Sequence, residues 1–239
     1  AIVAVLVFTS IFTTSFPHFK VPNSAAMKGA TILPILSQLN ANMKVILASG
    51  SPRRKELIGQ LGLTDVSVLV STFAEDFDKT MFSCPQDYCL ATASKKVEEV
   101  ALKFNGHKQK TLVIGADTII EIDGKVLEKP VDAADSKRML TLMRNRDHFV
   151  HTAVIAYCNT NNIEASAPDA LFLCEQSQQP VMKNIFSFVE STKVTFADLS
   201  DNDICAYVAL GEGSDKAGSY AIQGTGGLFV KGIEGCYYN

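Results

Sequence analysis

The residues best suited to chemistry stand between a short apolar run and an expected helix. The apolar run is KVILA at residues 44–48, and the sequence SGSPRR at residues 49–54 follows it directly. A helix N-terminus presents unpaired backbone N–H groups and a partial positive charge, so two arginines there are unfavourable unless an anion binds. Backbone amides, hydroxyl groups and guanidinium groups would then converge on phosphates. The side chains concerned are those of Ser49, Ser51, Arg53 and Arg54.

The alternative for this segment is a basic first turn that is exposed to solvent and binds nothing. The segment also lacks the G-x-x-x-x-G-K-[ST] spacing of a Walker A loop. Its residues therefore predict phosphate binding without predicting a P-loop fold.

Asp117 is the candidate for acid–base or metal chemistry. It follows the buried apolar run at residues 111–116, TLVIGA, and is therefore expected at the carboxyl end of a strand, where ligand sites of α/β folds collect. A carboxylate there can hold Mg²⁺ or activate a water molecule. The alternative is an aspartate that only forms a turn.

A β-hairpin is expected immediately after Asp117. Asp123-Gly124 lies between alternating apolar residues, which is a strong signal for a two-residue hairpin turn. The register continued along both strands places Thr118 opposite Lys129. Lys129 can neutralise phosphate charge, although a solvated surface lysine explains it equally well. The hairpin would carry to one end of the sheet Asp117, Thr118, Glu128 and Lys129.

Several further residues are weaker candidates. Glu75 and Asp76 follow a second expected strand and can add a metal ligand. Asp215-Lys216 joins a carboxylate to a cation in a glycine-rich loop, where both can equally be solvated. Gln223 can recognise a nucleobase through its amide group. Lys95 and Lys96 are by default the solvated face of a helix.

Alternating strands and helices position these groups and predict a two-layer or three-layer α/β domain. Strands are expected at residues 44–48, 66–70, 111–116, 149–157 and 192–196. Helices are expected from Pro52 to Gly62, and at residues 88–104, 132–143 and 200–210. Ser51, Asp132 and Ser200 are suitable N-caps, and Gly211 is a suitable C-cap.

Composition limits the class of protein. The 239 residues include 22 Lys and Arg against 25 Asp and Glu, a net charge of −3, which argues against general nucleic-acid binding. Six cysteines without a C-x-x-C pair indicate free thiols in a reducing compartment, so we expect a cytoplasmic protein. Cys84 and Cys89 with His107 match no zinc spacing. His148 and His151 lie three apart in an expected strand and should face opposite ways.

Two segments do not fit the α/β pattern. The first fourteen residues are apolar, but they are shorter than the ~20 residues that span a bilayer and lack a basic flank. We expect residues 1–43 to be a poorly ordered leader or an extension of the gene model, with membrane association only if the leader is genuine. Residues 159–189 are polar and irregular, and are expected to be a surface insertion or a retained intron.

Taken together, the motifs resemble those of the Maf family of nucleotide pyrophosphatases. The similar segments are ASGSPRRKELI, IGADTIIEIDGKVLEKPVDAADSKRML, ESTKVTFADLS and DKAGSYAIQGTGGLFVKGIEGCYYN. They occur in the family's order and cover residues 44–239 apart from the insertion. The SPRR, EKP and IQG elements resemble the branch that acts on dTTP and UTP, including the Maf-like domain fused to a methyltransferase-like domain in animals.

The resemblance implies a Maf/Ham1-like (inosine triphosphatase-like) α/β fold. This fold is two-lobed, with a mixed, elongated central sheet and flanking helices, and is usually a homodimer. The implied reaction is hydrolysis of dTTP or UTP, and of modified pyrimidine nucleotides, to the monophosphate and pyrophosphate with Mg²⁺ or Mn²⁺. The alternatives are a 7-methyl-GTP pyrophosphatase, or a non-catalytic nucleotide-binding module linked to cell-division control.

The resemblance also assigns roles to residues. Asp117 matches the proposed general base and metal ligand, Glu75 an acidic position near the metal and water, and Lys129 a phosphate-contacting position that assists catalysis. Positions tied to substrate choice match Arg53, Thr118 and Gln223. The remaining positions expected to contact substrate match Ser49, Ser51, Arg54, Lys96, Glu128, Asp215 and Lys216.

The sequence departs from the family pattern in two places. Family members continue past the position of Asn239 through an N-x-x-G-x-P segment and a last helix, so we expect some apolar surface to be exposed. Ala221 stands where glycine is usual before the Ile-Gln pair, which can tighten the base pocket.

Overall fold

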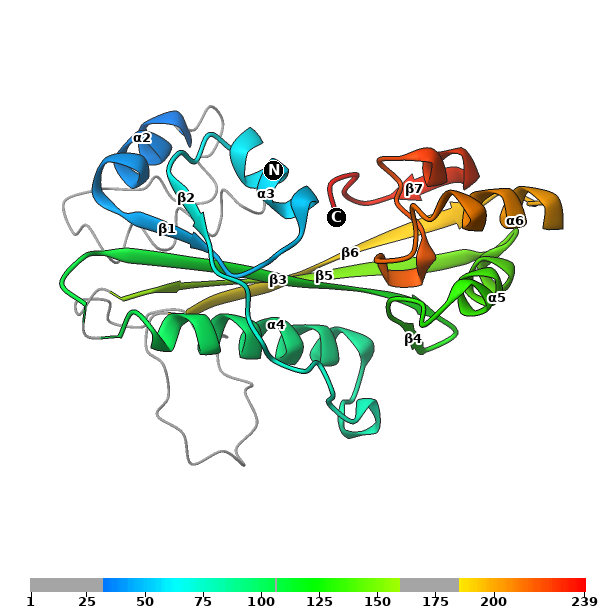
Figure 1. The fold of residues 1–239 in the computed structure, drawn as a ribbon, viewed down its shortest axis with the longest axis horizontal. Coiled ribbons are helices and arrows are strands. Elements are labelled where there is room, and N and C mark those ends of the chain that lie inside the picture. The colour runs from blue at the N-terminus through cyan, green and yellow to red at the C-terminus, as the bar shows by residue number, and fades with distance from the viewer. Residues whose placement is uncertain (1–31, 106, 160–184) are drawn as a thin grey trace. The chain divides into compact units, whose positions relative to one another are not determined.

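The computed structural model describes residues 32–105, 107–159 and 185–239 (Figure 1). The described residues form two compact units. Unit 1 lies within Ala1–Asp76, Ala91–Ala116 and Val154–Phe188, and unit 2 within Phe77–Leu90, Asp117–Ala153 and Val189–Asn239. The two units agree with the two-lobed expectation.

The described strands form one mixed sheet in the order β2-β1-β3-β5-β6-β7, with β4 paired to β3. β1 pairs in parallel with β2 and β3, whereas β4 and β7 pair antiparallel with their neighbours. The expected α/β class, with a mixed sheet and flanking helices, is confirmed. The bounds are β1 Lys44–Leu47, β2 Val66–Val68, β3 Thr111–Ile122, β4 Lys125–Leu127, β5 Asp147–Cys158, β6 Ile185–Phe196 and β7 Val230–Glu234.

Unit 1 is a three-layer arrangement. Helices α2 (Ile32–Asn42) and α3 (Pro52–Gln60) lie on one face of its strands, and α4 (Pro85–Leu102) runs along the other face (Figure 1). Leu39 of α2 and Ile58 of α3 pack in one cluster with Val45 of β1 and Leu112 of β3. The close approach of α4 depends on a glycine, because a Cβ at residue 115 would lie 2.4 Å from Cγ2 of Val97.

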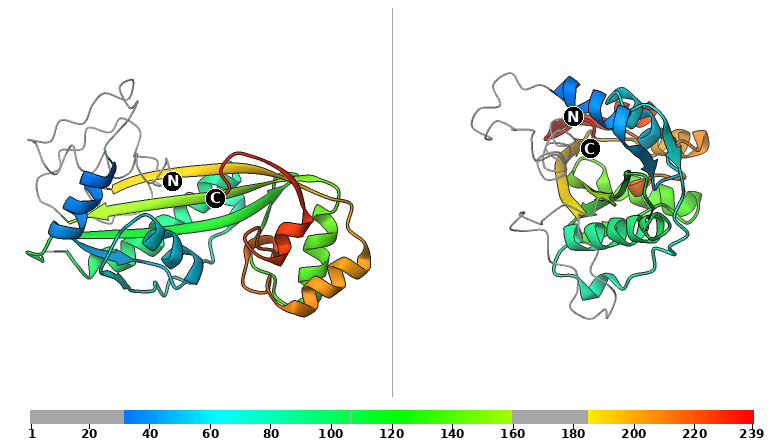
Figure 2. Two further views of the ribbon diagram at one scale, coloured as in Figure 1. Left: turned by 90° about the horizontal axis from the view of Figure 1, so that it is seen from above. Right: turned by 90° about the vertical axis from the view of Figure 1, so that its left-hand side faces the viewer.

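Unit 2 packs α5 (Ala133–Met143) and α6 (Asp201–Leu210) side by side (Figure 2). Both helices begin as predicted: Asp132 accepts a hydrogen bond from the N–H of Asp135, and Ser200 forms a capping box with Asp203. Gly211 ends α6 with φ 72°. The short helices are η2 (Lys79–Met81), η3 (Ala217–Ser219) and η4 (Thr225–Phe229).

Strand β3 corrects one expectation about the site. The prediction ended this strand at Ala116, but β3 continues through Asp117 to Ile122. Asp117 therefore lies in the middle of a strand and not at its carboxyl end. Asp117 is polar, but the β-branched residues Thr118, Ile119 and Ile120 that follow it favour a strand and continue the ladder.

The predicted hairpin turn is confirmed. Asp123 and Gly124 have φ values of 52° and 72°, and Ile122 pairs with Lys125 across the turn. The ladder ends earlier than expected, because β4 stops at Leu127. The expected pairing of Thr118 with Lys129 is therefore wrong, and Lys129 lies in the exposed segment after the strand.

The two irregular segments are only partly described. Residues 32–42, which the sequence placed in the leader, form α2, and Leu39 is fully buried. β6 likewise begins at Ile185, inside the expected insertion at 159–189. Residues 1–31 and 160–184 lie outside the described residues. None of the helices that the structure describes combines the length and apolarity needed to cross a bilayer.

Candidate active site

In unit 1, Arg54 joins the loop before α3 to strand β3. Its Nη1 donates hydrogen bonds to the backbone carbonyl of Ala116, at 2.7 Å, and to Oγ of Ser49, at 3.2 Å. The N–H of Ser51 also donates to Oγ of Ser49 at 3.2 Å. Ser49 is buried, so this hydroxyl shapes the loop from inside. The segment predicted to bind phosphate, residues 49–54, is therefore held in place by hydrogen bonds within unit 1.

Helix α3 begins as predicted, with Ser51 at the N-cap and Pro52 in the first turn. The Ser51 side chain makes no capping hydrogen bond, so it does not satisfy the first amides of the helix. Arg53 pairs with Glu56 at 2.7 Å on the helix surface, and its buried Nε has no partner among the described residues. Within the part of the chain that the structure describes, Arg53 is thus held by a half-exposed ion pair, whereas Arg54 is bound to the backbone.

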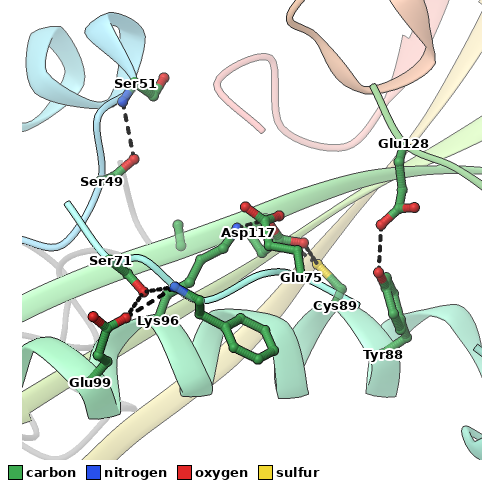
Figure 3. A network of polar contacts seen from close by, with 12 residues as sticks. Ser49, Ser51, Ser71, Glu75, Tyr88, Cys89, Lys96, Glu99, Asp117 and Glu128 are labelled. Carbon is green, nitrogen blue, oxygen red and sulfur yellow. Dashed lines mark hydrogen bonds and ion pairs between the residues drawn. The ribbon is translucent and has the colours of Figure 1, made fainter. Parts of the chain in front are cut away.

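Glu75 and Lys96 form an ion pair in unit 1, with 2.7 Å between Oε2 and Nζ. The Lys96 side chain is only 12% exposed, so the solvated helix face expected for it is wrong. Glu75 has φ 56°, a left-handed backbone that is rare for a residue with a Cβ. One turn further along α4, Glu99 binds the segment that leads to Glu75 (Figure 3).

In unit 2, Asp117 is buried, with 7% of its surface exposed. The Cys89 thiol lies 3.5 Å from its backbone carbonyl and 3.9 Å from its Oδ2 (Figure 3). Thr118, the next residue, shares a hydrogen bond of 3.0 Å with Thr152 on strand β5. Asp117 is therefore a carboxylate enclosed by protein, as a base in a water-poor site would be.

Glu128 is engaged by protein groups. Its Oε1 accepts a hydrogen bond from the hydroxyl of buried Tyr88, and its Oε2 pairs with Lys79 at 2.7 Å (Figure 3). The Lys79 ammonium also lies 5.1 Å from the centre of the Tyr88 ring. The Glu128 carboxylate thus holds the segment after β4, and Lys129 beside it is exposed.

The loop at residues 215–218 docks beside Glu128. The N–H of Gly218 donates to the Glu128 carbonyl at 2.9 Å, and a Cβ on Gly218 would lie 2.6 Å from Cγ1 of Ile120. Asp215 pairs with Lys216. The hydrogen bond from Lys216, with a weaker contribution from the Lys129 charge, lowers the pKa of Asp215.

Gln223 lies at the surface of unit 2, where its amide donates to the Tyr237 carbonyl at 2.9 Å. This bond uses one of the two N–H donors of the Gln223 amide group.

The structure thus divides the predicted residues between the units. Unit 1 brings together Ser49 and Ser51 of the loop before α3 with Arg53 and Arg54 of the first turn of α3, and Glu75 with Lys96 in one ion pair. Unit 2 contains Asp117, Thr118, Glu128, Lys129, Asp215, Lys216 and Gln223. Four supporting residues were not predicted: Lys79, Tyr88, Cys89 and Glu99. Only Glu99 had a signal in the sequence, since it lies three residues after Lys96 on one helix face.

Two histidines are buried in unit 2, and they contact different groups. His148 bonds to the Tyr220 hydroxyl at 2.8 Å, and burial lowers its pKa to about 4. His151 contacts Glu121 and Ser191, each at 2.8 Å. The cysteines of the described segments are free thiols, and no cluster of three or more metal-binding side chains occurs there.

Comparison with known proteins places these features in context. The family model described as Maf-like protein matches residues 44–239. A human protein named probable bifunctional dTTP/UTP pyrophosphatase/methyltransferase is 38% identical over 210 residues, which are 87% of this chain and 31% of the human one. The chain therefore spans less than a third of that relative.

Bacterial relatives match over most of their length. A dTTP/UTP pyrophosphatase of Shewanella oneidensis is 41% identical over 82% of this chain and 89% of its own. One of Bacillus cytotoxicus is 38% identical over 82% and 87%. Among solved structures, a nucleoside-triphosphatase / dITP/XTP pyrophosphatase of Mycobacterium abscessus aligns with 66% of this chain and 76% of its own at 12% identity. Its TM-score of 0.34 is too low to carry an argument.

Proposed function

Because this chain belongs to the family of Maf-like proteins, we propose that it is a nucleoside triphosphate pyrophosphatase acting on dTTP and UTP. It hydrolyses them to the monophosphate and pyrophosphate. The observation that carries the proposal is the link made by Arg54, which joins the loop before α3 to the residue preceding buried Asp117. The names of the bacterial relatives supply the substrate class.

The loop before α3 binds the phosphates in this proposal. Its amides at the start of the helix lack a side-chain cap, and Arg53 is held only by Glu56. A phosphate offers both groups a stronger partner than they have in the free protein. Arg54 keeps the loop in shape, and Lys96 and Lys129 add positive charge.

Asp117 acts as the general base. Its carboxylate takes a proton from a water molecule that attacks the α-phosphorus, the bond from this phosphorus to the bridging oxygen breaks, and pyrophosphate leaves. Such phosphoryl chemistry depends on positioning and charge neutralisation. Asp117 is 7% exposed, so few other water molecules would compete for its carboxylate in this proposal.

The residues present fit Mg²⁺ or Mn²⁺ held jointly with the substrate. The described residues contain no ready-made cluster of three ligands, and Mg²⁺ commonly uses one or two carboxylates together with substrate phosphates. Glu75 of unit 1 and Asp117 of unit 2 are each proposed as a carboxylate ligand. The ion would supply positive charge at the phosphates and would make a water molecule more acidic.

Nucleobase selection is assigned to Arg53, Thr118 and Gln223, and modified pyrimidine nucleotides belong to the same proposal. One N–H of the Gln223 amide bonds to Tyr237, and the amide also carries a second N–H donor and a carbonyl acceptor with which it can recognise a base. Asp215 and Lys216 contact the substrate from their loop. The protein is further proposed to be a cytoplasmic homodimer without general affinity for nucleic acid, in keeping with its net charge of −3.

A substrate panel tests the function. The full chain is incubated with dTTP, UTP, 7-methyl-GTP and the other common nucleoside triphosphates, with Mg²⁺, with Mn²⁺ and with chelator. Pyrophosphate release from dTTP and UTP that chelator abolishes is expected, and isotopically labelled water should deliver its oxygen to the monophosphate. A preference for 7-methyl-GTP would overturn the substrate, and a folded protein without activity would favour a nucleotide-binding module.

A further inference from the structure

Glu99 binds the segment before Glu75 at several points. Its carboxylate accepts hydrogen bonds from the backbone N–H groups of Thr72 and Phe73, at 2.9 and 3.1 Å, and from the Thr72 hydroxyl, at 2.8 Å. The Ser71 hydroxyl donates to the same carboxylate (Figure 3). One side chain of α4 therefore fixes three consecutive residues of a segment that has no regular secondary structure.

The same helix face holds the other end of this segment. Lys96 lies three residues before Glu99, and residues at this spacing share one face of a helix. Its ammonium pairs with the Glu75 carboxylate at 2.7 Å. Residues 71–75 are thus fastened to α4 at both ends, by an anion at one end and a cation at the other.

Glu75 itself needs such support. Its φ of 56° is unfavourable for a residue with a Cβ, and a backbone of this kind persists only where the surroundings hold it. The Lys96 ion pair binds the Glu75 side chain but does not fix its backbone. The bonds from Glu99 to Thr72 and Phe73 fix the backbone two and three residues upstream.

We propose that Glu99 is a positioning residue, which sets the direction of the Glu75 carboxylate and keeps Glu75 in register with Lys96. This role rests on the proposed function, in which Glu75 and Lys96 serve the metal and the phosphates. Glu99 does not touch the substrate and acts only through segment 71–75.

The hydrogen bonds from residues 71–73 to the Glu99 carboxylate, called the clamp below, persist over the range of pH in which the protein would be assayed. The hydrogen bonds from Ser71 and Thr72 lower the pKa of Glu99 to about 2. The carboxylate is therefore ionised and accepts these bonds at any pH well above that value.

A conservative pair of variants tests the clamp without reference to activity. Glu99→Gln replaces one acceptor oxygen by a donor, and the control Glu98→Gln alters the neighbouring residue, which pairs with Lys95 instead. Hydrogen exchange of a peptide containing residues 71–76 is measured in both variants of the full chain. We expect Glu99→Gln to speed exchange by about ten- to a hundred-fold, and Glu98→Gln to leave it unchanged. Equal exchange in the two variants would overturn the proposal.

A double-mutant cycle tests whether Glu99 acts through Glu75. Glu99→Gln is expected to lower kcat/KM for dTTP by about ten- to a hundred-fold, mainly through kcat, because misplaced groups are costly. In a Glu75→Gln background the same change should cost less than about two-fold. Equal losses in both backgrounds would show a merely structural role and overturn the proposal.

The cycle also separates this inference from the proposed function. If the wild-type chain releases no pyrophosphate from any nucleotide, the proposed function fails. The exchange experiment then decides alone whether Glu99 orders the segment that carries Glu75.

Discussion

The guanidinium of Arg54 donates a hydrogen bond of 2.7 Å to the carbonyl of Ala116, the residue directly before Asp117. The same Nη1 donates to the Ser49 hydroxyl, so one side chain ties the loop before α3 to strand β3. Among the described residues, the ion pair that Arg53 makes is with Glu56. Arg54 thus holds the loop, whereas Arg53 is the arginine that we propose to contact the ligand.

This difference predicts different outcomes for two equivalent changes. Arg54→Met should lower the free energy of unfolding by about 1–3 kcal/mol, because bonds from a charged donor to buried groups are lost. Arg53→Met should change it by no more than about 0.5 kcal/mol, because half-exposed ion pairs contribute little. Urea unfolding measures both.

Kinetics separate the same two variants. Arg53→Met should raise KM for dTTP at nearly unchanged stability, since its guanidinium is proposed to meet the phosphates or base. Equal loss of stability in both variants would contradict the assignment of separate tasks.

Gly115 leaves no room for a larger side chain between β3 and α4 in unit 1. A Cβ there would lie 2.4 Å from Cγ2 of Val97, so Gly115→Ala should cost about 1–3 kcal/mol of stability. Adding Val97→Ala should recover part of this loss because it removes the clashing methyl groups. Thermal or urea unfolding provides the measurement.

Gly59 is the matched control for that change. A Cβ at this position in α3 meets nothing within 4 Å, so Gly59→Ala should raise stability by up to about 1 kcal/mol through helix propensity. If Gly115→Ala were as well tolerated as Gly59→Ala, the result would contradict the close packing of α4 on β3 that the structure describes.

Because His148 is buried, we predict that the protein loses stability in mild acid. Burial lowers its folded-state pKa from 6.5 to about 4, with the nearby Asp147 charge opposing the shift weakly. Between these two pH values the unfolded chain binds a proton that the folded chain does not. The free energy of unfolding should therefore fall by up to about 3 kcal/mol as the pH drops from 6.5 to 4.

A pair of phenylalanine substitutions provides the control. His148→Phe with Tyr220→Phe removes the titrating group and its hydrogen-bond partner together, while keeping rings that pack against Phe196. The stability of this double variant should depend less on pH in that window. An identical pH dependence in wild type and variant would exclude His148 as the cause.

Local signals in the sequence predicted much of the fold. The Asp123-Gly124 turn, the Asp132 and Ser200 caps and the Gly211 helix end all occur as predicted, because each depends on a few neighbouring residues. The length of β3 was wrong, because a polar residue does not end a strand whose ladder partners continue.

The candidate residues could be selected from the sequence, but their contacts could not be predicted. Residues 49–54 were selected for their hydroxyl and guanidinium groups next to an expected helix start. By contrast, the bond from Arg54 to Ala116 and the bond from Tyr88 to Glu128 join residues far apart in sequence. Such pairings follow from the sheet order, which a single sequence does not specify.

The most direct test of the account compares dTTP turnover and dTTP binding in wild type and Asp117→Asn. The two side chains are nearly the same size, so the buried site should keep its shape while the base is lost. We predict rapid pyrophosphate release by wild type, a loss of about a thousand-fold or more in Asp117→Asn, and dTTP binding in both proteins. Retained turnover in Asp117→Asn would contradict the role of Asp117 as general base. Absence of turnover in a folded wild type would contradict the proposed pyrophosphatase activity.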